Sequence, residues 1–167
     1  KVFYVATSGH DVSGAGLAPT SPFRTIKYAT QYILADQANR APATIFVSTG
    51  IYEEVLPIKV PAGVAIVGDE LRSTTVKPKE GSETQDMFQV RNGCGIRNMT
   101  LEGLSGSLGS PNNYGAQVPA SGAFVALDPG SGPTDSSVWI TTKSTYVQNV
   151  TTIGTACVGL KIDGALH

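Results

Sequence analysis

The strongest constraint in this sequence is a series of short β-branched or aromatic runs, each bounded by glycine, proline, asparagine or aspartate. The runs are residues 44–47, 57–60, 64–67, 74–77, 87–90, 96–101, 123–127, 137–141, 146–152 and 158–162. Short strands at regular spacing are typical of all-β proteins and fit a sandwich, a barrel or a solenoid. Glycine and proline occupy 19 and 10 of the 167 positions and only 15% of residues are charged, which disfavours long surface helices.

One segment has the periodicity of a helix instead. Ser21 can act as its N-cap, and Pro22 suits the first helical position. Apolar residues then recur at steps of three and four as far as Leu34, a pattern of about three turns. We expect the helix to end between residues 35 and 39, because Pro42 disfavours helical backbone at the residue before it.

The charge balance argues against two classes of partner. Lysine and arginine number 12 against 13 aspartates and glutamates, so there is no basic surplus to neutralise a nucleic-acid backbone. No apolar run approaches the roughly 18 residues that span a bilayer. The sequence therefore predicts no nucleic-acid partner and no membrane insertion.

The length fits a single domain, which we place at residues 1–167 and expect to be the N-terminal part of a longer chain. Residues 1–43 hold an opening strand and the helix, and residues 44–167 hold the remaining strands. Cys94 and Cys157 lie far apart among glycine and apolar neighbours, which favours buried free thiols over a disulfide or a metal site. We expect no cofactor and no metal.

A weak internal repeat links two later segments. Residues 96–103 and 147–154 share the order apolar, polar, Asn, apolar, Thr, two residues, Gly, and this places Asn98 and Asn149 51 positions apart. The repeat fits two coils of a solenoid or one coil enlarged by a loop. Asparagine tolerates left-handed backbone and bonds neighbouring backbone groups, which predicts a structural turn role for both residues. Both also satisfy the N-x-Thr glycosylation sequon, an alternative that a turn role disfavours.

A polar stretch at about residues 103–122 interrupts the strand pattern. Loops of that length in a compact domain are usually functional or mobile. Asn112, Asn113, Tyr114 and Gln117 offer hydrogen bonds and one aromatic face, so they are the candidate sugar-binding residues. The competing interpretation is that this loop covers the side of the fold or meets a neighbouring subunit.

Acidic residues are the candidates for catalysis, because two carboxylates across a groove can cleave a polysaccharide. They are Glu53, Glu54, Asp69, Glu70, Asp86, Asp128, Asp135 and Asp163. Neighbours such as Glu53 and Glu54 point to opposite faces of a strand, so a facing pair has to come from different coils. We therefore name no catalytic residue, and a structural or solvated role for Glu53 and Glu54 is the stronger interpretation.

Several segments resemble proteins of known architecture. Residues 4–11, 21–26, 44–54 and 64–68 together resemble the opening of right-handed parallel β-helix proteins of the pectate-lyase-like superfamily. Residues 68–78 and 154–164 are similar to β-helix virion proteins of tailed, particularly marine, bacteriophages. The resemblance implies an all-β fold, a right-handed parallel β-helix (solenoid), with an N-terminal capping α-helix over its first coil.

The same resemblance implies a structural virion component of a phage tail, tail fibre or spike, which serves assembly and contacts host-surface polysaccharide. Its partners would be other virion subunits, and the likeness to tailspikes implies a homotrimer. A first alternative is a polysaccharide lyase or glycoside hydrolase of the same superfamily. Family lyases bind calcium through clustered aspartates and use an arginine or lysine as base, and no stretch of this sequence matches that arrangement. A second alternative is a secreted or cell-surface adhesin.

Overall fold

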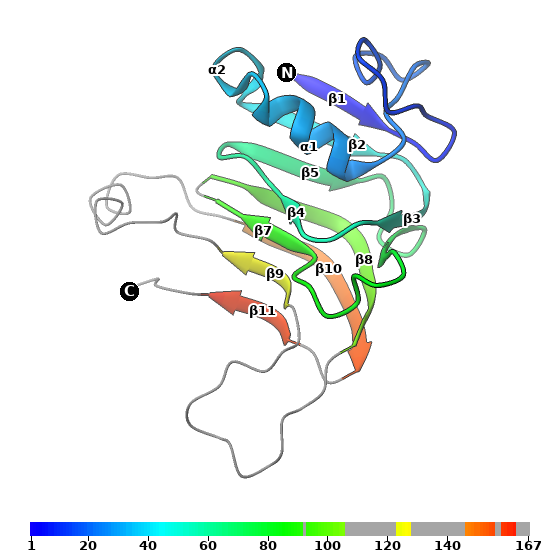
Figure 1. The fold of residues 1–167 in the computed structure, drawn as a ribbon, viewed down its shortest axis with the longest axis vertical. Helices are drawn as coiled ribbons and strands as arrows, with labels where there is room; N and C mark the ends of the chain where they lie inside the picture. The colour runs from blue at the N-terminus through cyan, green and yellow to red at the C-terminus, as the bar shows by residue number, and fades with distance from the viewer. Residues whose placement is uncertain (92, 106–122, 128–145, 156–157, 163–167) are drawn as a thin grey trace, which may run out of the picture.

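The computed structural model describes residues 1–91, 93–105, 123–127, 146–155 and 158–162 (Figure 1). Over these residues the chain is mostly β, with two short helices near the N-terminus. Its strands pair in parallel and curl into a solenoid-like arrangement. Within the part of the chain that the structure describes, neither helix has the length and apolar character needed to cross a membrane.

The strands agree closely with the short runs of the sequence. They are β1 (Val2–Val5), β2 (Ala43–Val47), β3 (Gly50–Glu54), β4 (Ile58–Lys59), β5 (Val64–Gly68), β6 (Thr74–Pro78), β7 (Phe88–Val90), β8 (Gly95–Ser105), β9 (Ala123–Leu127), β10 (Tyr146–Thr155) and β11 (Val158–Ile162). The helices are α1 (Ile26–Leu34) and α2 (Gln37–Arg40). The prediction of a mostly β, parallel chain is confirmed. The expected run 137–141 lies outside the described residues, and β3 is a strand that the run pattern did not include.

Each pass of the chain, or coil, adds one parallel strand to each of three stacks. The first stack has the order β1-β2-β5-β8, the second β3-β6-β8 and the third β4-β7-β9-β11. Strand β8 belongs to two stacks, because its first part pairs with β5 and its later part with β6. Strand β10 pairs with β8 from Tyr146 to Thr155. The two repeat segments are therefore neighbouring strands, and the repeat marks a single coil step.

Strand alternation places the core residues in columns. Ile45 pairs in register with Ile66, and Ile66 pairs with Ile96. All three side chains are 0% exposed, while their neighbours along β2 and β5 are partly exposed. Fully burying one such side chain stabilises a fold by about 1.5–3 kcal/mol. Columns of this kind hold successive coils together.

Helix α1 lies across the N-terminal end of the stacks and covers the first coil (Figure 1). It buries Ile26, Ala29, Thr30 and Ile33 in the core. These positions recur at steps of three and four, so one face of the helix, apolar except for Thr30, points into the core. We call residues 6–40, which contain this helix, the cap.

The outer edge of β1 is covered by the cap itself. The N–H of Tyr4 donates to the carbonyl of Gly16 at 2.9 Å, and the Tyr4 carbonyl accepts from the N–H of Phe23 at 2.8 Å. Because Phe23 is held beside β1, the helix begins at Ile26 rather than Pro22. The predicted N-cap at Ser21 is therefore wrong.

The N-cap of α1 is Thr25, whose hydroxyl accepts a hydrogen bond from the N–H of Tyr28 at 3.1 Å. A threonine in extended conformation directly before the first turn is a favoured N-cap.

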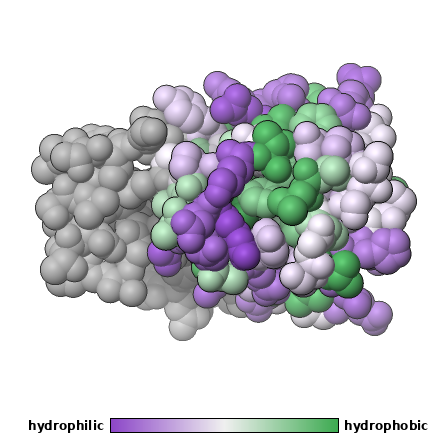
Figure 2. All heavy atoms as spheres, turned by 90° about the horizontal axis from the view of Figure 1, so that it is seen from above, coloured by the Kyte–Doolittle hydropathy of each residue, from purple (hydrophilic) through white to green (hydrophobic). Residues whose placement is uncertain are grey.

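The upper face of the molecule mixes hydrophobic and hydrophilic residues (Figure 2). Within the cap, the exposed large hydrophobic residues include Val12, Leu17 and Leu34.

Two asparagines bend the long strands β8 and β10 at the same level. Asn98 has a φ of 56° and Asn149 a φ of 52°, both in the left-handed region. The Nδ2 of Asn149 donates to the Oδ1 of Asn98 at 3.0 Å. Each residue thus turns its strand at a corner, and the two side-chain amides bond between coils.

Candidate functional site

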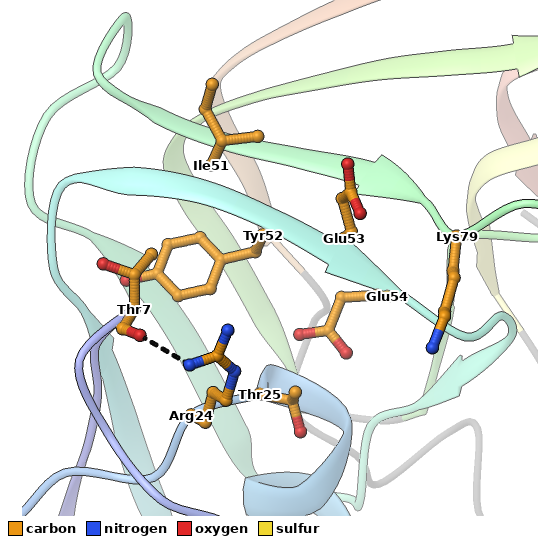
Figure 3. Close-up of a pocket in the computed structure, with 8 residues that line it drawn as sticks. All are labelled: Thr7, Arg24, Thr25, Ile51, Tyr52, Glu53, Glu54 and Lys79. Atoms are coloured by element: carbon orange, nitrogen blue, oxygen red, sulfur yellow. Dashed lines mark hydrogen bonds between the residues drawn. The ribbon is translucent and has the colours of Figure 1, made fainter.

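A cavity of about 550 Å³ lies where the cap meets the first strand of the second stack (Figure 3). It is lined by Thr7, Arg24, Thr25, Ile51, Tyr52, Glu53, Glu54 and Lys79. Three distant segments form it: the cap, strand β3, and the residue that follows β6. Its size is within the range of ligand sites in proteins, about 300–1,000 Å³.

Alternation along β3 gives its four cavity residues two different environments. Tyr52 and Glu54 point inward and are 3% and 1% exposed, whereas Ile51 on the outer face is 60% exposed. Glu53 is also exposed, and its carboxylate points away from that of Glu54 (Figure 3). These two acids therefore do not face each other, as strand geometry requires.

Glu54 fastens helix α1 to β3. Its carboxylate accepts hydrogen bonds from the N–H of Ile26 at 2.6 Å and of Lys27 at 3.3 Å. These are amides of the first helical turn, which have no partner inside the helix. Burial raises the pKa of Glu54 to about 7, and the hydrogen bonds from Ile26 and Lys27 only partly offset this.

Asp11 and Tyr52 stabilise the two sides of the cavity. Asp11 accepts hydrogen bonds from the N–H of Arg24 at 2.8 Å and from the Thr25 hydroxyl at 2.7 Å. The Tyr52 hydroxyl donates to the carbonyl of Ser48 at 2.8 Å. Burial, with a smaller contribution from the charge of Glu54, raises the pKa of Tyr52 to about 12. The hydrogen bonds of Asp11 and Tyr52 thus stabilise the fold around the cavity.

Two exposed cations flank Glu54 in the view of Figure 3. Arg24 donates through Nη1 to the carbonyl of Thr7 at 3.1 Å, which holds the guanidinium at the cavity. The backbone N–H of Lys79 donates to the carbonyl of Glu54 at 2.7 Å. Among the described residues, the Lys79 ammonium has no hydrogen bond or ion pair, so it is available to a ligand.

A charged column runs down the outer face beside the cavity. Glu53 pairs in register with Lys77, and the Nζ of Lys77 lies 2.9 Å from Oε1 of Glu102 on the next coil. Neighbouring strands are about 4.8 Å apart, so the Glu53 and Glu102 backbones are separated by about 10 Å. This face therefore carries two carboxylates from different coils, with Lys77 between them.

Two other residues that the sequence analysis singled out, Glu70 and Cys94, form contacts within the fold. Glu70 accepts hydrogen bonds from the N–H of Arg72 at 3.0 Å and from the Ser73 hydroxyl at 2.6 Å, which closes a turn. The Ser73 hydroxyl is the largest of the influences that lower the pKa of Glu70. Cys94 is a buried free thiol, and its Sγ lies 3.1 Å from the carbonyl of Pro61.

The candidate sugar-binding residues Asn112, Asn113, Tyr114 and Gln117 lie outside the described residues. The cavity residues Arg24 and Lys79 were missed, because the sequence gives no signal that the cap and the end of β6 meet. Over the described residues, no group of three or more His, Cys, Asp or Glu side chains could hold a metal ion.

A family model described as "Protein of unknown function (DUF1565)" matches residues 7–164. The chain belongs to this family. The match begins in the cap and extends beyond β11, so the family includes both the cap and the stacked strands. No curated protein and no solved structure matches the chain.

Proposed function

We propose that the chain is a right-handed parallel β-helix module of a phage tail, fibre or spike, which serves as a rigid element in assembly and contacts host-surface glycans. The observation that carries this proposal is the in-register parallel stacking of β1, β2, β5 and β8 under a cap. A stack of this kind gains its stability from contacts between neighbouring coils, which suits an extended rod.

The bonding of the acidic residues supports a structural role. Glu54 holds a helix, Glu70 closes a turn, and Glu102 forms an ion pair between coils. Asp11 holds the N-terminal end of α1. These carboxylates are engaged in contacts that maintain the fold.

Immunogold electron microscopy tests the virion role, in phage particles whose genome encodes the chain. We expect label on the tail or its fibres. The virion proposal is wrong if purified particles contain no copy of the chain by mass spectrometry.

Glycan contact is tested with an array of acidic and neutral surface polysaccharides. The proposed contact residues are those of the loop at 103–122, so a variant carrying Asn112→Ala, Asn113→Ala and Tyr114→Ala should bind at least about tenfold more weakly. Lys59→Ala, an exposed change on β4, is the control and should bind as the unmodified chain does. Equal binding by the loop variant would exclude this loop as the contact.

The charged column favours a second candidate, a glycoside hydrolase or polysaccharide lyase. The Glu53 and Glu102 backbones are about 10 Å apart, and rotation of these long side chains can bring their carboxyl groups to the roughly 6.5–9.5 Å that separates carboxyl pairs in inverting hydrolases. If this candidate is correct, the chain releases reducing ends from an acidic polysaccharide and either Glu53→Gln or Glu102→Gln abolishes the release. Activity that survives both substitutions would exclude this pair.

A further inference from the structure

Strand β3 has one paired edge and one open edge. The N–H of Gly50 donates to the carbonyl of Ser73, and the carbonyl of Glu54 accepts from the N–H of Lys79, both at 2.7 Å. In a parallel pair the N–H and C=O of one residue point to the same side, and successive residues alternate. Ile51 therefore directs its backbone groups away from β6, and so does Glu53. These groups have no hydrogen-bond partner among the described residues.

The other first-coil strands are protected differently. The outer edge of β1 bonds to the backbone of Gly16 and Phe23, and helix α1 packs over β4. The open edge of β3 instead adjoins the cavity of about 550 Å³. The open edge of β3 ends at Val55, whose carbonyl accepts a hydrogen bond from the Nζ of Lys27 at 2.7 Å. An unpaired strand edge beside free volume is a template for an added strand.

We propose that this cavity binds an extended acidic peptide segment of a partner protein, which adds as a strand to the open edge of β3. The inference rests on the proposed assembly role, in which the partner is another virion subunit. The polar groups of Ile51 and Glu53 are two residues apart, or about 6.6 Å, which is the repeat of an extended main chain. This match favours a peptide over a sugar.

The charges at the cavity favour an acidic segment. Arg24 and Lys79 are exposed cations at its rim, and Glu53 is the exposed acid there. Glu54 also lines the cavity, but it is 1% exposed and its carboxylate accepts hydrogen bonds from the helix amides. The exposed charge is therefore positive, and acidic side chains would complement it.

The probe for this proposal is a fluorescent, end-blocked hexapeptide of alternating threonine and aspartate. We expect the hexapeptide to bind the intact chain. The double variant Arg24→Ala/Lys79→Ala should bind the hexapeptide about tenfold more weakly, because two complementary charges at the rim are lost. The matched control is Arg97→Ala/Lys59→Ala, which removes two exposed cations elsewhere and should leave binding unchanged. A threonine–lysine hexapeptide should not bind.

The strand-addition geometry has its own readout. The amides of Ile51 and Glu53 should gain protection from hydrogen exchange when the acidic peptide binds, and a peptide N-methylated at every residue, which has no main-chain N–H to donate, should not bind in this manner. The inference is wrong if the acidic peptide does not bind at millimolar concentration, or if it binds without protecting these amides. It is equally wrong if an oligouronate occupies the cavity and the peptide does not. None of these results affects virion labelling or loop-dependent glycan binding, so failure here and failure of the proposed function are distinguishable.

Discussion

At the scale of single residues, Glu54 connects two parts of the molecule that are separate in sequence. Its position in β3 places the carboxylate beneath the first turn of α1, where it accepts hydrogen bonds from Ile26 and Lys27. The same burial that brings it to these amides disfavours its charge. A buried acid in a junction makes the stability of that junction sensitive to pH.

We expect stability to fall with rising pH because of Glu54. Its pKa rises from an ordinary 4.5 to about 7 on folding, so its contribution is complete below pH 4.5 and is lost as pH rises through about 7. A shift of this size corresponds to about 3 kcal/mol in the free energy of unfolding. Urea unfolding between about pH 4.5 and pH 7 measures this change in the free energy of unfolding. The variant Glu54→Gln should make the free energy of unfolding less dependent on pH. Glu53→Gln at the exposed neighbour is the control, and an unchanged slope in Glu54→Gln would show that another group is responsible.

Asn98 offers a second test at this scale. Alanine and glycine both remove the oxygen that accepts from Asn149, but only alanine disfavours the left-handed backbone at a φ of 56°. That conformation costs a residue with a Cβ roughly 1–2 kcal/mol. We expect Asn98→Ala to be less stable than Asn98→Gly by about 1 kcal/mol in urea unfolding. Equal stabilities of the two variants would show that the left-handed backbone at position 98 does not favour glycine over alanine.

At the scale of elements, helix α1 closes the hydrophobic core at the N-terminal end. Its inward side chains include Ile33, which is fully buried, while the next residue, Leu34, is 42% exposed. Two neighbouring residues of similar volume thus face the core and the solvent. The pair separates the effect of core packing from that of helix propensity.

Ile33→Ala should destabilise the chain by about 3 kcal/mol, because it leaves a space in the packed core. Leu34→Ala should cost less than about 1 kcal/mol, since most surface substitutions have small effects. Thermal or urea unfolding of both variants makes the comparison. Similar losses in the two would mean that α1 does not pack on the coils as described.

The helices and strands show how much of the fold could be predicted from the sequence. The short runs predicted most strands well, because each run is an alternating segment that its own turn residues bound. The N-cap was misplaced at Ser21, because the local signal was overridden by the pairing of Phe23 with β1, a long-range contact. The cavity could not be predicted at all, since Arg24 and Lys79 meet only after the cap has folded onto β3.

At the scale of the whole molecule, the spacing between coils limits what each position can hold. Gly68 is buried where β5 passes Asn98, and a Cβ there would overlap the carbonyl oxygen of Asn98. At Gly95 an added Cβ would lie 3.5 Å from the Cβ of Ala65, an ordinary contact. Two glycines of the same stack therefore differ in whether the coils can accept a methyl group.

We expect Gly68→Ala to cost about 1–3 kcal/mol, because adjacent coils have to separate to admit the methyl group. Gly95→Ala should change the free energy of unfolding by less than about 0.5 kcal/mol. Urea unfolding of both variants provides the measurement. A stable Gly68→Ala variant would contradict the close approach of β5 and β8.

The bonds from Gly16 and Phe23 to β1 also determine how copies of the molecule can associate. Both outward backbone groups of Tyr4 are already bonded to the cap, so another copy cannot pair with β1 at this residue while the cap is in place. A copy that paired with the outer edge of β1 would first have to displace Gly16 and Phe23 of the cap. Concentrated solutions should accordingly remain free of filaments that nucleate by strand pairing at β1.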